Sequence, residues 1–388
     1  MEFSVNSNAL FGLSDMMDRR WEDFETARTY LKANTQFSVL NAGLLNDLLG
    51  QHQRIVDGID GFLSGAAQRF AGPCAAAVIE ANVSYRSSDR NAVNRADAAL
   101  PIPGTVLWGG GATTIVPPAT ARPTGPADQS LDRSVFVDVR CPVGWLQPPP
   151  DHRADHPLEP SLLDALSPTT VLRDAIWAAT SLAATFGMLD RPYDIVAEVV
   201  QPLSGDWSGY LRCADVYDNI AHTIEDAAAC VDDGRMTIGR VWTGNAAEAC
   251  ITSLAAFSTN LRAAIDPLHT TAANYRTVAE TVRADSEVLA AMLTLLADFI
   301  IETGLEAPTG LLEAPYEVVG EAVNLEKLAT KVFDVMKIMA KLREFVRAGM
   351  SGAESVTAGL GLVWDSTPLP MMLATAPNLP RPAIARLQ

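Results

Sequence analysis

The stretch Val241-Trp242-Thr243-Gly244-Asn245-Ala246-Ala247 separates two long series of apolar residues and decides the fold of this chain. Before it, apolar residues recur every three or four positions from Trp207 to Val231, and after it the same spacing runs from Leu254 to Ile300. Such a repeat gives each segment a helix with one apolar stripe. The short glycine-containing connection makes the helices reverse and pack their stripes together. The sequence therefore predicts an antiparallel helical hairpin with Trp242 at its turn.

The N-terminal part, residues 1–98, predicts a second helical hairpin. Apolar residues from Leu10 to Leu31 have helical spacing, and a second helical stretch runs from Leu44 towards Ala81. We expect a break in this stretch at Gly72-Pro73, because proline lacks the backbone N–H that an inner helical turn requires.

Residues 99–168 differ in composition and predict a Pro/Gly-rich linker. Gly109-Gly110-Gly111, Pro117-Pro118 and Pro148-Pro149-Pro150 disfavour regular helix. The three glycines lack the lysine and hydroxyl residue of a phosphate-binding loop, so they also belong to the linker. One short strand is expected at Val135–Val139.

The rest of the chain divides into residues 169–304, which contain the hairpin with Trp242, and residues 305–388. Pro267 is expected to kink the second arm of this hairpin. Residues 305–388 predict a C-terminal helical extension, with one helix from Val323 to Val346 and a Pro-rich tail. The predicted fold is all-α: an elongated bundle of two antiparallel helical hairpins with a linker and this extension.

Composition excludes several classes of protein. The 388 residues are 48% hydrophobic and only 19% charged, which predicts a large core rather than intrinsic disorder. A formal net charge of -17 argues against nucleic acid as a partner, because phosphate binding needs Lys and Arg. The first residues lack the basic and apolar regions of a signal peptide. Val288–Ile301 is shorter than the roughly 20 residues that span a bilayer and is expected to be buried helix.

The titratable residues do not predict an enzyme. Asp151–His156 contains metal-capable side chains, but no further ligands follow at zinc-site spacing, so a solvated loop is favoured over a metal site. His52, His222 and His269 fall on separate helices without a Ser, Cys or Asp grouping. We therefore expect no catalytic residues, no metal and no cofactor.

Two further groups of residues leave alternatives open. Cys230 and Cys250 lie about equally far from the Trp242 turn, so they form either a disulfide or two small core residues. The last long helix carries a basic face that is either solvated or in contact with anionic lipid. Its residues are Lys327, Lys331, Lys337, Lys341, Arg343 and Arg347.

The Trp242 stretch resembles the turn of the WXG family of type VII (ESX) secretion substrates, in which W-x-G-x-A-A-x-A opens the second helix of a hairpin. A second motif, Tyr85-Arg86-Ser87-Ser88-Asp89, is similar to the Y-x-x-x-D export signal of that system. Tyr85 and Asp89 are four residues apart and share one face of a helix. The resemblance covers residues 1–98 and 170–303.

A Y-x-x-x-D hairpin followed by a W-x-G hairpin resembles the EspB-like substrates, which join PE-like and PPE-like halves in one chain. The resemblance implies that Tyr85 and Asp89 form the export signal and that Trp242 and Gly244 complete one recognition surface. It also implies a type VII secretion ATPase or chaperone as partner. The long linker and the C-terminal extension, which is neither a long Gly-rich tail nor a recognisable toxin, depart from the EspB-like pattern.

The function expected from this resemblance is that of a secreted, non-enzymatic protein outside the cytoplasmic membrane of an actinobacterium. Long amphipathic hairpins associate side by side, so a self-assembling scaffold and a homo-oligomer are expected. The alternative is a toxin-delivery or membrane-perturbing effector whose activity lies in residues 305–388. A third alternative is a cytosolic helical adaptor or chaperone that is not exported.

Overall fold

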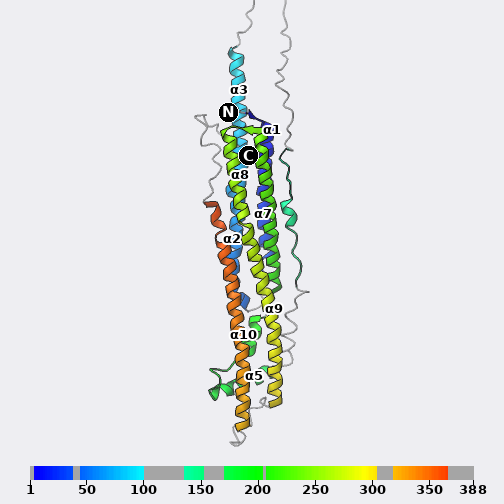
Figure 1. Ribbon diagram of the computed structural model, residues 1–388, viewed down its shortest axis with the longest axis vertical. Coiled ribbons are helices and arrows are strands. Elements are labelled where there is room, and N and C mark those ends of the chain that lie inside the picture. The colour runs from blue at the N-terminus through cyan, green and yellow to red at the C-terminus, as the bar shows by residue number, and fades with distance from the viewer. Residues whose placement is uncertain are drawn as a thin grey trace, which may run out of the picture.

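The computed structural model describes residues 4–37, 44–99, 135–152, 170–203, 207–303 and 318–365. These residues form an elongated bundle in which long helices run side by side (Figure 1). Within the described ranges, β structure is limited to one two-stranded bridge. The predicted all-α bundle is therefore confirmed.

The helices are longer than the apolar patterns alone predict. The N-terminal elements are β1 (Ser4–Val5), α1 (Ser7–Asn34), α2 (Leu44–Ser64), the π-helix η1 (Gly65–Ala71) and α3 (Gly72–Ala99). The central elements are the short helix η3 (Pro142–Trp145), α5 (Thr170–Thr185), the π-helix η4 (Val196–Val200) and α6 (Gln201–Leu203). The remaining elements are α7 (Trp207–Val241), β2 (Trp242–Thr243), α8 (Asn245–Ala263), α9 (Ile265–Thr303), α10 (Val318–Ala358) and η6 (Gly361–Asp365).

One continuous hydrophobic core joins these elements. Helix α7 packs along α8 and α9, α1 packs against α2, α3 and α7, and α10 packs along α9 and α2. Buried residues of every long helix belong to this core. The described residues of all four segments expected from the sequence share this core, including Phe136 of the predicted linker.

The two helix-interrupting prolines have different outcomes. Pro73 does not interrupt the helix. The π-helix η1 precedes it, and the Gly72 N–H donates to the Ala67 carbonyl, five residues back. The expected break there is wrong, and the helix continues with a local π insertion. At Pro267 the interruption is present: α8 ends at Ala263, whose carbonyl the proline ring would clash with, and α9 begins at Ile265.

Residues 135–152, here called the strap, lie against the bundle instead of forming part of a free linker. The expected strand at Val135–Val139 is wrong, because these residues have no strand partner among those described. Phe136 is buried against the core. Asp138 accepts hydrogen bonds from Arg19 Nε at 2.7 Å and from Arg20 Nη1 at 2.9 Å. The buried Phe136 and the ion pairs of Asp138 with Arg19 and Arg20 thus attach the strap to the bundle.

Three more contacts extend this attachment along the strap. The Trp145 indole N–H and Arg140 both donate to the Asp226 carboxylate, each at 2.9 Å. The Tyr30 hydroxyl donates to the Gln147 carbonyl at 2.8 Å. The strap is therefore held by side chains of both α1 and α7.

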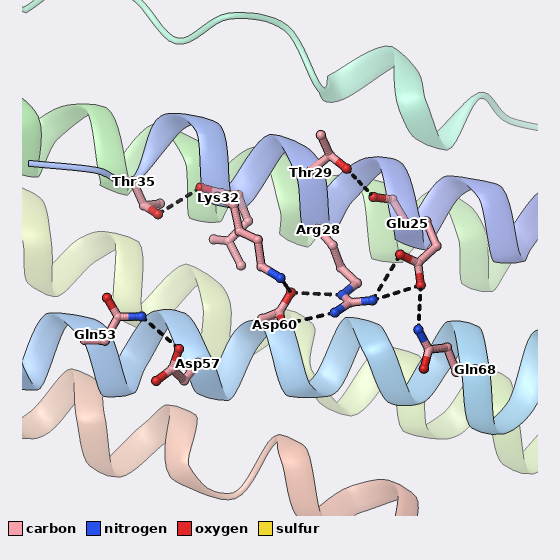
Figure 2. A network of polar contacts seen from close by, with 10 residues as sticks. Glu25, Arg28, Thr29, Lys32, Thr35, Gln53, Asp57, Asp60 and Gln68 are labelled. Carbon is pink, nitrogen blue, oxygen red and sulfur yellow. Dashed lines mark hydrogen bonds and ion pairs between the residues drawn. The ribbon is translucent and has the colours of Figure 1, made fainter.

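A polar seam joins α1 to α2 outside the core. Arg28 donates to Asp60 and to Glu25, and Lys32 approaches the same Asp60 carboxylate at 3.1 Å (Figure 2). Gln68 of η1 extends the seam by donating to Glu25 at 3.2 Å. Burial raises the pKa of Asp60, but the hydrogen bonds from Arg28 and Lys32 outweigh it and hold the pKa below its usual value.

Near the end of its described part, the C-terminal extension carries a tryptophan that packs between helices. Trp364 of η6 is 5% exposed, and its indole N–H donates to the Phe62 carbonyl of α2 at 2.8 Å. Its ring also packs against Phe257 of α8, with the centroids 5.6 Å apart. Any side chain at Gly65 would collide with this ring. The extension is therefore part of the fold, since it joins α2 to α8.

The apolar stretch Val288–Ile301 lies within α9, and its helical stripe faces the core. The stripe consists of Leu289, Leu293, Leu296 and Ile300, all buried. Among the described residues, no helix has both the length and the apolar character needed to cross a membrane.

Candidate functional site

The Trp242 turn is built from an extended dipeptide and one glycine. Helix α7 ends at Val241, and Trp242-Thr243 is extended before α8 begins at Asn245. Gly244 has φ 109° and ψ 177° and forms the N-cap of α8. This is a backbone conformation that essentially only glycine adopts. The glycine of the W-x-G motif is therefore required by the turn itself.

The structure brings Tyr85 and Trp242 into contact, although the sequence separates them widely. The two rings meet edge to face, with centroids 6.2 Å apart and planes at 76°. Trp242 is 1% exposed, whereas Tyr85 is only partly buried on α3. Aromatic pairs prefer this edge-to-face geometry. The residues of the two motifs thus form one aromatic pair at the end of the bundle.

The polar atoms of this pair differ in their surroundings. Burial raises the pKa of the Tyr85 hydroxyl, and the approaching Trp242 indole N–H partly opposes the rise. Trp242 Nε1 has no partner of hydrogen-bond geometry among the described residues. Asp89 lies on α3 one helical turn after Tyr85, and its side chain is outside the described residues.

The N-terminal strand covers the turn from the other side. β1 pairs antiparallel with β2, so that Val5 lies opposite Trp242 and Ser4 opposite Thr243. The Asn6 N–H donates to the Val241 carbonyl at 2.8 Å. The Asn6 side chain then caps α1 by accepting from the backbone of Asn8 and Ala9. This bridge was not predicted, because two residues carry no recognisable strand pattern.

Helix α3 is joined to the start of α1 next to this turn. The Asn82 side chain donates to the Ser7 carbonyl at 2.9 Å. Arg86, within the Y-x-x-x-D motif, donates to Asn8 and lies 4.9 Å above the Phe11 ring. One end of the bundle therefore combines the start of α1, the middle of α3 and the α7–α8 turn.

Cys230 and Cys250 are free thiols with different neighbours in the structure. The Cys230 thiol donates to the Arg140 carbonyl of the strap. Burial, and after it the neighbouring Cys74 of α3, raise the pKa of the Cys250 thiol. Equal distance from the turn fixes a residue's height along a helix but not the face on which it lies. Both cysteines are buried, as the alternative of two small core residues predicted.

The histidines are partly grouped, which the sequence did not predict. His269 of α9 lies 2.7 Å from Asp218, and its ring meets that of His222 at 5.2 Å. His152 of the strap lies 2.7 Å from Asp215. The sequence feature that could have indicated this group is the spacing of Asp215, Asp218 and His222, which places the three residues on one side of α7. No cluster of three or more metal-capable side chains occurs in the part of the chain that the structure describes.

The basic residues of α10 are only partly available to a ligand. Lys331 lies 5.7 Å from the Phe299 ring centroid, and Arg343 donates to the Glu198 carbonyl at 3.0 Å. Lys327, Lys337 and Lys341 are exposed. The predicted basic face therefore exists as a partly engaged, partly solvated surface.

Comparison of the chain with protein-family models, with curated proteins and with solved structures gives no match.

Proposed function

We propose that this chain is a secreted, non-enzymatic substrate of a type VII (ESX) secretion system, and that its export surface combines Tyr85 and Asp89 with the Trp242–Gly244 turn. The supporting observation is the edge-to-face contact between Tyr85 and Trp242. This contact joins the Y-x-x-x-D motif to the W-x-G motif, and each motif resembles part of a type VII substrate. The expected partner is the secretion ATPase or a dedicated chaperone.

The division of roles within this surface follows from burial. Trp242 is almost fully buried and fixes the turn, so a partner would contact Tyr85 and the adjoining face of α3. Truncating a buried aromatic side chain costs about 3–5 kcal/mol of stability. A Trp242→Ala variant would therefore combine unfolding with any loss of recognition, and Trp242→Phe is the better test of this position.

The experiment compares Tyr85→Ala, Tyr85→Phe, Asp89→Asn and Trp242→Phe in a host with an active type VII system. We expect Tyr85→Ala and Asp89→Asn to fold normally by circular dichroism but to remain in the cells. Trp177→Ala is the matched control, because this exposed aromatic residue lies on α5, away from the turn (Figure 1). Export of Tyr85→Ala and Asp89→Asn at the level of the unmodified chain would refute the proposal.

The scaffold part of the proposal rests on an exposed stripe of α9. Val288 and Leu295 are seven residues apart on one face and are 50% and 58% exposed. Side-by-side association of such helices would cover this stripe. Analytical ultracentrifugation of the purified chain and of a Val288→Glu, Leu295→Glu variant tests it. A monomeric unmodified chain, or an assembly unaffected by the substitutions, would remove self-association through α9 from the proposal.

The alternative of an effector in residues 305–388 has less support. The apolar face of α10 that a membrane-active helix would need is already packed in the core. Its buried residues are Leu325, Leu328, Val332, Val335, Met339, Leu342, Val346 and Met350.

A further inference from the structure

Two cysteines are close to each other where the strap lies against α7. Cys230 is buried on α7, 2% exposed, and its thiol donates to the Arg140 carbonyl oxygen at 3.5 Å. Cys141 is the next residue of the strap, and it is the one exposed cysteine of the five in the chain. The buried Cys230 thiol therefore contacts the peptide group that joins Arg140 to the exposed Cys141.

The dimensions of that peptide group limit the distance between the two residues. A carbonyl oxygen lies about 2.8 Å from the Cα of the following residue in a trans peptide, which puts Cys230 Sγ at most about 6 Å from the Cys141 Cα. In a disulfide each sulfur lies about 4 Å from the Cα of the partner cysteine, because the S–S bond is about 2.05 Å long, so the strap and α7 would have to approach by up to about 2 Å. The Cys141 sulfur now lies against the η3 turn, where a Cβ at Gly144 would be 3.6 Å away. Rotation about its Cα–Cβ bond and a small shift of the strap would bring the sulfurs together.

We propose that Cys141 and Cys230 form a disulfide under oxidising conditions, and that this bond fixes the strap to α7. The oxidant is a low-molecular-weight disulfide such as oxidised glutathione. The Cys141 thiolate attacks one sulfur of the oxidant, forming a mixed disulfide and releasing one thiolate. The Cys230 thiolate then attacks Cys141 Sγ and releases the second. Two protein thiols are oxidised, and one disulfide is reduced to two thiols.

The order of attack follows from accessibility. Cys141 is open to a soluble oxidant, whereas the strap covers Cys230. Burial raises the pKa of the Cys230 thiol, although the positive charge of Arg20 acts in the opposite direction. Cys230 therefore reacts only with a sulfur delivered next to it, which is what the mixed disulfide on Cys141 provides.

The other cysteines offer Cys230 no equivalent partner. Cys213 donates to the Thr35 carbonyl in the aromatic part of the core. Cys250 has Cys74 of α3 as its neighbour. All three are buried. Their substitution therefore provides controls that leave the Cys141–Cys230 pair unchanged.

The test uses the purified full-length chain in glutathione buffers of increasing oxidised fraction. Thiols are then titrated after unfolding, and we expect the count to fall from five to three. Digestion after Arg, Lys and Glu without reduction should yield one linked pair of peptides containing Cys141 and Cys230. Cleavage after Glu225 is needed, because it separates Cys213 from Cys230.

The variants make the result specific. Cys141→Ser should show no linked pair, and Cys250→Ser should form the pair as the unmodified chain does. If Cys230→Ser fails to fold, Cys141→Ser still tests the proposal, because its side chain is exposed. A persistent mixed disulfide on Cys141, or a linkage of Cys230 to any other cysteine, would overturn it. The measurement does not depend on export, so it can fail or succeed independently of the proposed function.

Discussion

His52 shows how one buried residue can make the stability of the whole bundle depend on pH. Its Nε2 lies 2.8 Å from the Thr35 carbonyl, which can only accept, so Nε2 carries the proton. Its Nδ1 then accepts from the Tyr275 hydroxyl, also at 2.8 Å. The neutral ring is therefore fully hydrogen-bonded. Burial lowers the pKa of His52 from 6.5 to about 4.

We predict that the free energy of unfolding falls as the pH drops from about 6.5 to about 4. Over this range the unfolded chain binds a proton at His52 that the folded chain does not, so acid favours unfolding. The full effect of this pKa difference is about 3 kcal/mol. Urea titrations at several pH values would measure it. His52→Gln should be less stable at neutral pH but lose this part of the pH dependence, and an unchanged profile would contradict the assignment.

At the scale of elements, the strap is the segment whose structure differs most from the prediction. Its prolines and glycines do exclude a long helix, as expected, but they do not keep the chain away from the bundle. Burial of Asp138 raises its pKa, yet hydrogen bonds from Arg19 and Arg20 outweigh this and hold the pKa below its usual value. Arg20 is itself 1% exposed. The strap thus supplies one of the two carboxylates that neutralise a buried arginine.

We predict that Asp138→Asn destabilises the chain by about 1–3 kcal/mol, because the buried Arg20 keeps only Asp23 as a charged partner. Trypsin should then cleave the strap after Arg140 faster than in the unmodified chain. Asp57→Asn is the control, since Asp57 is exposed and accepts a hydrogen bond from the exposed Gln53 of its own helix. Equal stability of the two variants would show that Asp138 is not needed.

The same elements show what sequence reasoning could reach. Apolar residues at helical spacing predicted α1, α7, α9 and α10, because burial of one stripe is a local pattern. Residues whose structure depends on a distant partner were not predictable in this way. Val5 is a strand residue only because it pairs with Trp242, and Trp364 is positioned by its hydrogen bond to the Phe62 carbonyl. Cys230 and Cys250 were placed at the same distance from the turn, but the sequence did not show which neighbours each one has. The residues of the proposed site were identified from motifs, and the resemblance implied that they share one surface, whereas the edge-to-face contact of Tyr85 with Trp242 is visible only in the structure.

At the scale of the whole molecule, the shared core implies that the chain unfolds as one unit. Helix α10 covers surfaces of both α2 and α9, and Trp364 closes the space above Gly65. Residues 318–365, the described part of the segment that the sequence indicated as a separate extension, therefore contribute to stability along much of the bundle.

We predict that a chain ending at residue 304 is less soluble and melts at a lower temperature than the full-length chain, because the faces covered by α10 become exposed. Trp364→Ala should show a smaller effect in the same direction, about 3–5 kcal/mol. Leu362→Ala serves as the control, since Leu362 is 65% exposed. Calorimetry of the full chain should give a single transition. Two separate transitions, with the first abolished by truncation, would contradict the shared core.

The pairing of β1 with β2 has a consequence for how the protein is made. More than half of the chain lies between Val5 and Trp242, so the N-terminal strand has no partner until the ribosome has passed the turn. At about 5–20 residues per second, this delay is on the order of tens of seconds. During that time the face of α1 that later meets α7 is uncovered. The contact between β1 and β2 can therefore form only after Trp242 has been synthesised, long after α1.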